Sequence, residues 1–123
     1  MKIRTVYFKV SDIEKACLYW QALLRIDPVK STAEYCEFRV ENINLGLVLN
    51  DFGDKFEGAN CVPVFEFSDA ELQVYIERAK SLGSTVILNG LEDPRLLSVI
   101  FADPWGNEFE LSKFHDLRLR SWS

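Results

Sequence analysis

The chain has 123 residues, about the length of one domain, and is 48% hydrophobic, 27% charged and 13% aromatic. This composition is typical of a folded globular protein and excludes disordered and fibrous classes. Because 14 basic residues stand against 19 acidic ones, the net charge is −5, which argues against a nucleic-acid partner. No apolar run approaches the roughly 20 residues that span a bilayer. Since the first residues lead into a strand-like segment and not a signal peptide, we expect a cytoplasmic protein with no membrane partner.

Cysteine and histidine usage limits the possible sites. Cys17, Cys36 and Cys61 lie far apart and form no Cys-x-x-Cys motif, so we expect buried, reduced thiols and neither a disulfide framework nor a thiolate zinc site. His115 is the one histidine, which excludes sites with several histidines. It leaves at most one candidate for a Ser-His or Cys-His nucleophile.

An internal repeat divides the chain into halves. Val6–Glu14 and Pro63–Glu71 both run from an apolar, strand-like segment into Ser-Asp-x-Glu, and the second copy lies 57 residues after the first. Serine followed by glutamate three residues later is the spacing of a capping box, so we expect helices capped by Ser11 and Ser68.

The remaining elements follow in chain order. The first helix has an apolar face of Ile13, Ala16, Cys17, Trp20 and Leu24, and predicted strands follow at Val29–Ser31, Tyr35–Val40 and Ile43–Asn50. The second helix has an apolar face of Leu72, Tyr75, Ile76, Ala79 and Leu82, and Gly83 is suited to end it. Strands are then predicted at Thr85–Leu88, Leu97–Ala102 and Glu108–Ser112, with a hairpin loop over 103–107.

These elements predict an α+β fold of two tandem βαβββ modules, whose curled mixed sheets carry the helices on their outer faces. We expect one domain, 1–123, with module one at about 1–50, a linker at about 51–60, module two at about 61–114 and a C-terminal tail at 115–123.

Three stretches resemble the vicinal oxygen chelate superfamily, which includes glyoxalase I, extradiol dioxygenases, fosfomycin-inactivating enzymes and bleomycin resistance proteins. They are 10–20, which runs from Val-Ser-Asp-Ile-Glu-Lys-Ala to Tyr-Trp; the repeat at 67–69; and 101–111. The last stretch, Phe-Ala-Asp-Pro-Trp-Gly-Asn-Glu-Phe-Glu-Leu, is similar to the family's closing pattern of Asp-Pro-x-Gly-Asn followed by Glu-Leu. Arg25 departs from the pattern, because the family often has glycine after the first helix.

The resemblance implies metal ligands at four strand positions, which carry over to Thr5, Gly46, Val62 and Glu110. Only Glu110 is a strong ligand, since a threonine hydroxyl binds weakly and glycine and valine supply no side-chain donor. Because a useful site needs three or more side-chain ligands, we expect no metal and no other cofactor.

In the family the sheets curl into a cup, and strand alternation indicates which side chains would line it here. Tyr7 and Lys9 would face inward with Thr5, while Val6, Phe8 and Val10 would pack under the helix. The expected ligand-binding residues are Tyr7, Lys9, Val48, Val64, Glu66, Trp105 and Glu110. Such a lining suits an organic ligand that is partly cationic or a hydrogen-bond donor.

Three functions remain open. The first is a glyoxalase- and bleomycin-resistance-like protein, metal-free and homodimeric, that binds a small organic molecule in the cup between the modules. The second is a divergent lyase, isomerase or dioxygenase with a rebuilt metal site or with Glu110 as acid–base catalyst. The third is a dimeric interaction module with a vestigial cup. Under any of the three, we expect the tail residues His115, Arg118, Arg120 and Trp122 to form a surface or dimer contact. We favour binding over catalysis, because three of the four family metal positions lack a strong ligand.

Overall fold

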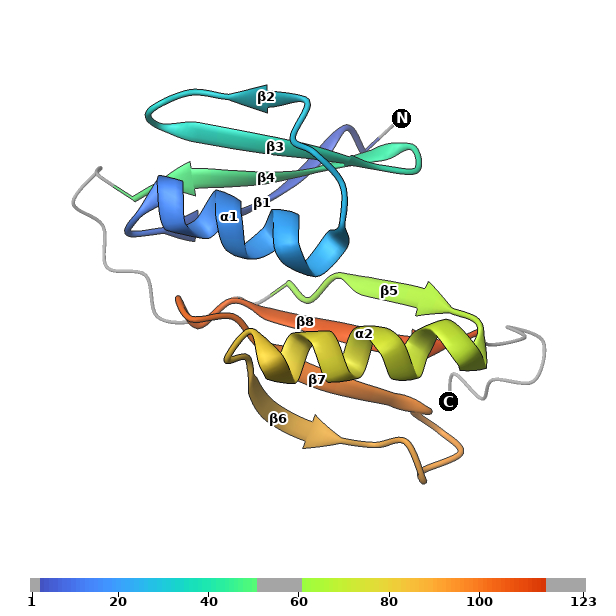
Figure 1. Cartoon of the computed structure of the whole chain (residues 1–123). Helices are drawn as coiled ribbons and strands as arrows, with labels where there is room; N and C mark the ends of the chain where they lie inside the picture. Colours follow the sequence, from blue (N-terminus) through green and yellow to red (C-terminus); the bar gives the residue numbers. More distant parts are fainter. Residues whose placement is uncertain (1–2, 51–60, 115–123) are drawn as a thin grey trace. The chain divides into compact units, whose positions relative to one another are not determined.

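The computed structural model describes residues 3–50 and 61–114 (Figure 1). The predicted linker at 51–60 and the predicted tail at 115–123, with His115 and Trp122, lie outside the described residues. The chain divides into two compact units, Met1–Gly58 and Ala59–Ser123, and each unit holds one βαβββ module. The predicted α+β fold of two modules is confirmed.

The first module is a four-stranded mixed sheet with one helix. Its elements are β1 (Thr5–Val10), α1 (Ile13–Leu24), β2 (Lys30–Ser31), β3 (Tyr35–Val40) and β4 (Ile43–Leu49). The strand order is β1-β4-β3-β2, in which β1 runs parallel to β4 and the other pairs are antiparallel. The parallel pair places the first and last strands of the module side by side.

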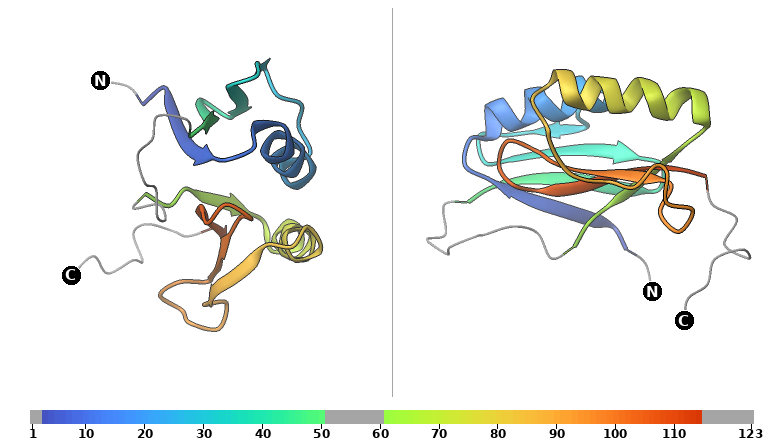
Figure 2. Two further views of the ribbon diagram at one scale, coloured as in Figure 1. Left: turned by 90° about the vertical axis from the view of Figure 1, so that its left-hand side faces the viewer. Right: turned by 90° about the horizontal axis from the view of Figure 1, so that it is seen from below.

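The second module repeats this plan. Its elements are β5 (Val64–Phe67), α2 (Asp69–Ser81), β6 (Thr85–Asn89), β7 (Ser98–Ala102) and β8 (Glu108–Lys113), in the strand order β5-β8-β7-β6. Figure 2 shows each helix along one face of its own sheet. Within the described ranges, neither helix has the length and apolar character needed to cross a membrane.

The two helices begin differently, which corrects one sequence-based prediction. Asp12, and not Ser11, caps α1, since its Oδ1 accepts a hydrogen bond from the backbone N–H of Lys15 at 3.0 Å. A carboxylate satisfies the free N–H groups and also favours the positive end of the helix dipole. Ser68 caps α2 as predicted, with its Oγ accepting from the N–H of Glu71 at 3.4 Å.

The core of each module lies between the helix and its sheet. On α1 the buried residues are Ala16, Tyr19, Trp20 and Leu23. The buried face of α1 is therefore rotated about the helix axis relative to the predicted apolar face. The predicted core residues Ile13, Cys17 and Leu24 lie at its margin. The rings of Phe8 and Trp20 are 5.5 Å apart beneath α1. In the second module, Leu72, Ile76 and Ala79 of α2 are buried as predicted.

Candidate functional site

Each sheet has a helix-free face, which we define by the strand residues that point away from the helix. Along β1, Phe8 and Val10 pack toward α1 and are 3% and 2% exposed, whereas Tyr7 is 55% exposed. The helix-free face of the first sheet holds alternate residues of β1, β4 and β3 (Thr5, Tyr7, Lys9, Asn44, Gly46, Val48, Tyr35, Glu37 and Arg39). This placement follows from the two-residue period of a strand.

One row across this face brings together residues far apart in the sequence. Tyr7 of β1 pairs with Gly46 of β4, and Gly46 pairs in turn with Glu37 of β3. The neighbouring row joins Lys9, Val48 and Tyr35 in the same way. The predicted residues Tyr7, Lys9 and Val48 therefore share a face with Tyr35 and Glu37, which the sequence-based set lacks.

Gly46 leaves the space that the ring of Tyr35 occupies. A Cβ at position 46 would stand 2.8 Å from the Tyr35 hydroxyl and 3.1 Å from Cβ of Tyr7. Real Cβ atoms essentially never approach so closely, so a larger residue would have to displace the ring. The glycine is therefore required for close approach of a side chain and not for a turn.

The Tyr35 hydroxyl donates a short hydrogen bond of 2.6 Å to Oε1 of Glu37. Burial is the main cause that raises the pKa of Tyr35 to about 12, and the hydrogen bond to the Glu37 carboxylate raises it further because it stabilises the protonated hydroxyl. Lys30 Nζ lies 5.7 Å from the centre of the Tyr35 ring, within cation–π range. The ring and the carboxylate are thus held in fixed positions on this face.

The second sheet carries its own carboxylate on the helix-free face. Ser98 Oγ of β7 donates to Oε1 of Glu110 on β8 at 2.9 Å. Glu110 pairs with Val64 of β5 on one side and with Ile100 of β7 on the other. The predicted residues Val64, Glu66 and Glu110 therefore share this face, since Glu66 pairs with Ser112 two positions along the same strands.

Each module has a carboxylate that accepts a hydrogen bond from a hydroxyl, but the carboxylates lie on strands that are not equivalent in the two modules. Position 46 in β4 corresponds to Glu110 in β8, because each pairs with the first strand of its module and with the strand before it in sequence. By the same register Tyr35 corresponds to Ser98. In module two the hydroxyl of Ser98 reaches across to Glu110. In module one the carboxylate lies on β3 as Glu37, and Tyr35 lies over the glycine.

The four positions that the family implies for a metal do not fit one. Gly46 and Val62 have no side-chain donor, Tyr35 lies over Gly46, and the Thr5 hydroxyl accepts a hydrogen bond from Arg4 at 3.2 Å. Across 3–50 and 61–114, no group of three or more His, Cys, Asp or Glu side chains is arranged to hold a metal ion. The donor set of one carboxylate and one hydroxyl is too poor for a divalent cation.

Trp105 belongs to a loop whose conformation Asp103 determines. Oδ1 of Asp103 accepts from the backbone N–H groups of Trp105 at 3.0 Å and Asn107 at 2.8 Å. Asp103 and Asn107 are buried, whereas Trp105 is half-buried and Gly106 adopts a φ of 84°. The Asp-Pro-Trp-Gly-Asn motif is therefore a structural turn, and a ligand contact by Trp105 stays a prediction.

Sequence reasoning missed Tyr35, Glu37 and Arg39 because it carried over only the strands that hold family metal positions. The signal was present in β3, where the apolar Cys36 and Phe38 alternate with Tyr35, Glu37 and Arg39. Alternation alone could have placed these side chains opposite the helix. Their position beside Gly46 could not have been read from that pattern.

Comparison with known proteins agrees with this architecture. No protein-family model matches the chain, and no curated protein matches it by sequence. Among solved structures, a glyoxalase-related enzyme from Fulvimarina pelagi has a TM-score of 0.79 at 16% identity, covering 92% of this chain and 88% of that one. A glyoxalase/bleomycin resistance protein from Albidiferax ferrireducens has a TM-score of 0.75 at 20% identity, covering 92% and 98%.

The fosfomycin resistance protein FosX from Listeria monocytogenes is also similar, with a TM-score of 0.74 at 20% identity and coverage of 98% of this chain and 97% of that one. At these identities the likeness is one of fold. The chain therefore has the fold of the glyoxalase, fosfomycin resistance and bleomycin resistance proteins of the vicinal oxygen chelate superfamily.

Proposed function

We propose that the chain binds a small organic molecule, without a metal, on the helix-free faces of its sheets. The observation that carries this proposal is that each face holds a carboxylate fixed by a hydroxyl, with Tyr35 bonded to Glu37 and Ser98 bonded to Glu110. A carboxylate oriented in this way is a prepared acceptor for a cationic or hydrogen-bond-donating group.

The surroundings of these carboxylates favour an aromatic cation. On the first face the ring of Tyr35 covers Gly46 next to the exposed Tyr7, so a flat ligand could stack on these aromatic side chains. On the second face Glu108 and Glu110 alternate along β8 with the buried Phe109 and Leu111 of the opposite face, and β5 adds Glu66. Three carboxylates beside Val64 and Ile100 combine negative charge with apolar surface, which suits a cation on an aromatic body.

The other predicted residues have subsidiary roles in this proposal. Val48 and Val64 supply apolar contact, and Lys9 sets the polarity at one end of the first face. Trp105 offers a ring from its loop. Affinity would come mainly from apolar and aromatic contact, whereas the carboxylates would select the charge of the ligand.

The test uses two fluorescent probes of opposite charge, the aromatic cation ethidium and the aromatic anion 8-anilinonaphthalene-1-sulfonate. The full chain should bind ethidium at least tenfold more tightly. Glu110→Gln and Glu37→Gln should each weaken ethidium binding several-fold and leave the far-UV circular dichroism spectrum unchanged. Equal binding of the two probes, or no binding of either, would reject the proposal.

Glu77→Gln is the matched control, because it removes the same charge from the exposed surface of α2, where Glu77 accepts a hydrogen bond from Gln73 at 3.0 Å. If Glu77→Gln weakens ethidium binding as much as Glu110→Gln does, overall charge and not a site accounts for the affinity.

We further propose that the protein acts as a homodimer in the cytoplasm. The resemblance to the superfamily supports the dimer, and the free state of Cys17, Cys36 and Cys61 suits a reducing compartment.

A further inference from the structure

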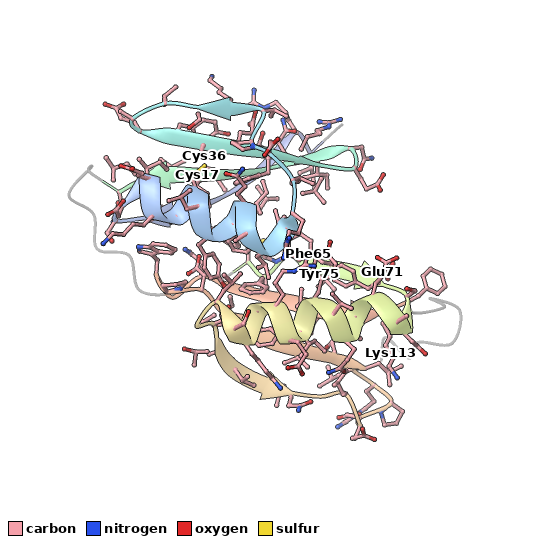
Figure 3. All side chains as sticks on the ribbon, viewed as in Figure 1. Cys17, Cys36, Phe65, Glu71, Tyr75 and Lys113 are labelled. Carbon is pink, nitrogen blue, oxygen red and sulfur yellow. The ribbon has the colours of Figure 1, made fainter. Side chains whose placement is uncertain are left out.

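Two cysteines from different elements meet in the core of the first module. Cys17 lies on α1 and Cys36 on β3, and Figure 3 shows both side chains between the helix and the sheet. The two thiol groups lie within hydrogen-bonding reach of each other, although 18 residues separate the cysteines in the sequence. Both cysteines are free in this structure.

The two thiols differ in access to solvent. Cys36 is fully buried, with 0% exposure, whereas Cys17 is half-buried at the margin of the helix face. Burial, with the neighbouring Cys17 thiol as a smaller cause, raises the pKa of the Cys36 thiol to about 12. Cys17 is therefore the thiol that a small oxidant reaches first, and Cys36 is placed to react with the product.

We propose that Cys17 and Cys36 form a reversible redox pair, in which a peroxide converts the two thiols into a disulfide that joins α1 to β3. This pairing is separate from the ligand-binding proposal and does not depend on it. The third cysteine, Cys61, is exposed at the start of the second unit and takes no part.

The reaction balances with hydrogen peroxide as the oxidant. The Cys17 thiolate attacks one peroxide oxygen, the O–O bond breaks, and the departing hydroxide takes up a proton to leave as water. The Cys36 sulfur then attacks the sulfur of the Cys17 sulfenic acid, the S–O bond breaks, and the hydroxide leaves as a second water with the Cys36 proton. Two thiols lose two electrons, and the peroxide is reduced to two waters.

The place of the disulfide matters because Cys36 lies between Tyr35 and Glu37 on β3. These neighbours point to the helix-free face, where they form the 2.6 Å hydrogen bond. The disulfide would therefore link α1 covalently to β3 on the opposite side of the strand from Tyr35 and Glu37.

The sequence allows a direct test by mass spectrometry, since trypsin cleavage after lysine and arginine places each cysteine in its own peptide. Cys17 lies in 16–25, Cys36 in 31–39 and Cys61 in 56–78. The native full chain is treated with hydrogen peroxide, free thiols are alkylated, and the chain is digested without reduction. We expect peptides 16–25 and 31–39 joined with the loss of two hydrogen atoms, Cys61 alkylated, and complete reversal by dithiothreitol.

Two variants make the assignment specific. Cys61→Ser should give the same joined peptides, and Cys17→Ser, at a half-buried position, should abolish them. A wild-type product with sulfinic acid on Cys17 and a free Cys36 thiol would overturn the proposal, as would a disulfide that includes Cys61. Because the wild-type digest decides the matter, the proposal stays testable even if Cys17→Ser is poorly folded.

Discussion

The ring of Tyr35 lies where a side chain at position 46 would otherwise stand, so a single glycine decides the surface of the first helix-free face. Three single residues lead to predictions of different physical kinds. Gly46 acts through steric fit, Tyr35 through its ionisation, and Arg25 through its backbone conformation. Each effect can be measured separately.

Gly46→Ala should destabilise the chain by about 1–3 kcal/mol, because the new Cβ must displace the Tyr35 ring and break its bond to Glu37. In a Tyr35→Ala background the same substitution should cost much less, since the obstructing ring is gone. Urea unfolding of the four proteins gives this coupling directly. Equal costs in both backgrounds would show that the ring does not determine the need for glycine.

Tyr35 should ionise near pH 12, above its ordinary pKa of 10.0. The native chain holds this proton more tightly than the unfolded chain, so the contribution to stability is complete below pH 10 and is lost as the pH rises toward 12. Absorbance at 295 nm should show a late tyrosinate phase that Tyr35→Phe removes. Tyr7→Phe, on the same face, should leave that phase in place.

Arg25 ends α1 with a φ of 58° and a ψ of 36°, a left-handed conformation that favours glycine. Arg25→Gly should therefore raise the free energy of unfolding by roughly 0.5–1 kcal/mol, the relief of strain being partly offset by the greater chain entropy of glycine. Arg25→Ala keeps the strain and should give no gain in urea unfolding. If both variants are equally stable, the strain at this position is negligible.

At the scale of elements, the hairpin loop between β7 and β8 shows how one side chain determines a connection. Asp103 accepts from two backbone N–H groups, and Nδ2 of Asn107 donates to its Oδ2 at 3.2 Å. Asp103 is 3% exposed, so water cannot replace these bonds. The loop is thereby held in the register that pairs β7 with β8.

Asp103→Ala should lower the free energy of unfolding by about 2–3 kcal/mol, because it leaves buried N–H groups without an acceptor. Thermal and urea unfolding measure the loss. Glu92→Ala removes an exposed carboxylate from the preceding loop and should change stability little. A similar loss in both variants would indicate an effect of charge and not of the turn.

The helix caps show how far local pattern determines an element. The capping spacing correctly predicted both helices, yet Asp12 and not Ser11 caps α1. Two adjacent residues can both accept from the free N–H groups, and the final choice depends on how the preceding strand enters the helix. The predicted strands differ from β2, β4, β6, β7 and β8 only at their ends, where pairing with a neighbouring strand decides the last hydrogen bond.

At the scale of the whole molecule, the proposed homodimer can be tested by sedimentation. The full chain should sediment with twice the mass of one 14.2 kDa chain. A chain that ends at Phe114 lacks the predicted contact segment and should sediment as a monomer while still binding ethidium. A truncated chain that remains dimeric would show that 115–123 does not form the contact.

The sequence predicts the two-module fold, because the Ser-Asp-x-Glu repeat, the helical apolar spacing and the Asp-Pro-Trp-Gly-Asn turn are all local patterns. It also placed Tyr7, Lys9 and Glu66 opposite the helices, because strand alternation needs no knowledge of neighbouring strands. Three contacts become visible in the folded chain alone: Tyr35 lies over Gly46, the Tyr35 hydroxyl bonds to Glu37, and Cys17 meets Cys36. These contacts depend on strand register and helix rotation, which arise when the core packs as a whole, so no single stretch of sequence encodes them.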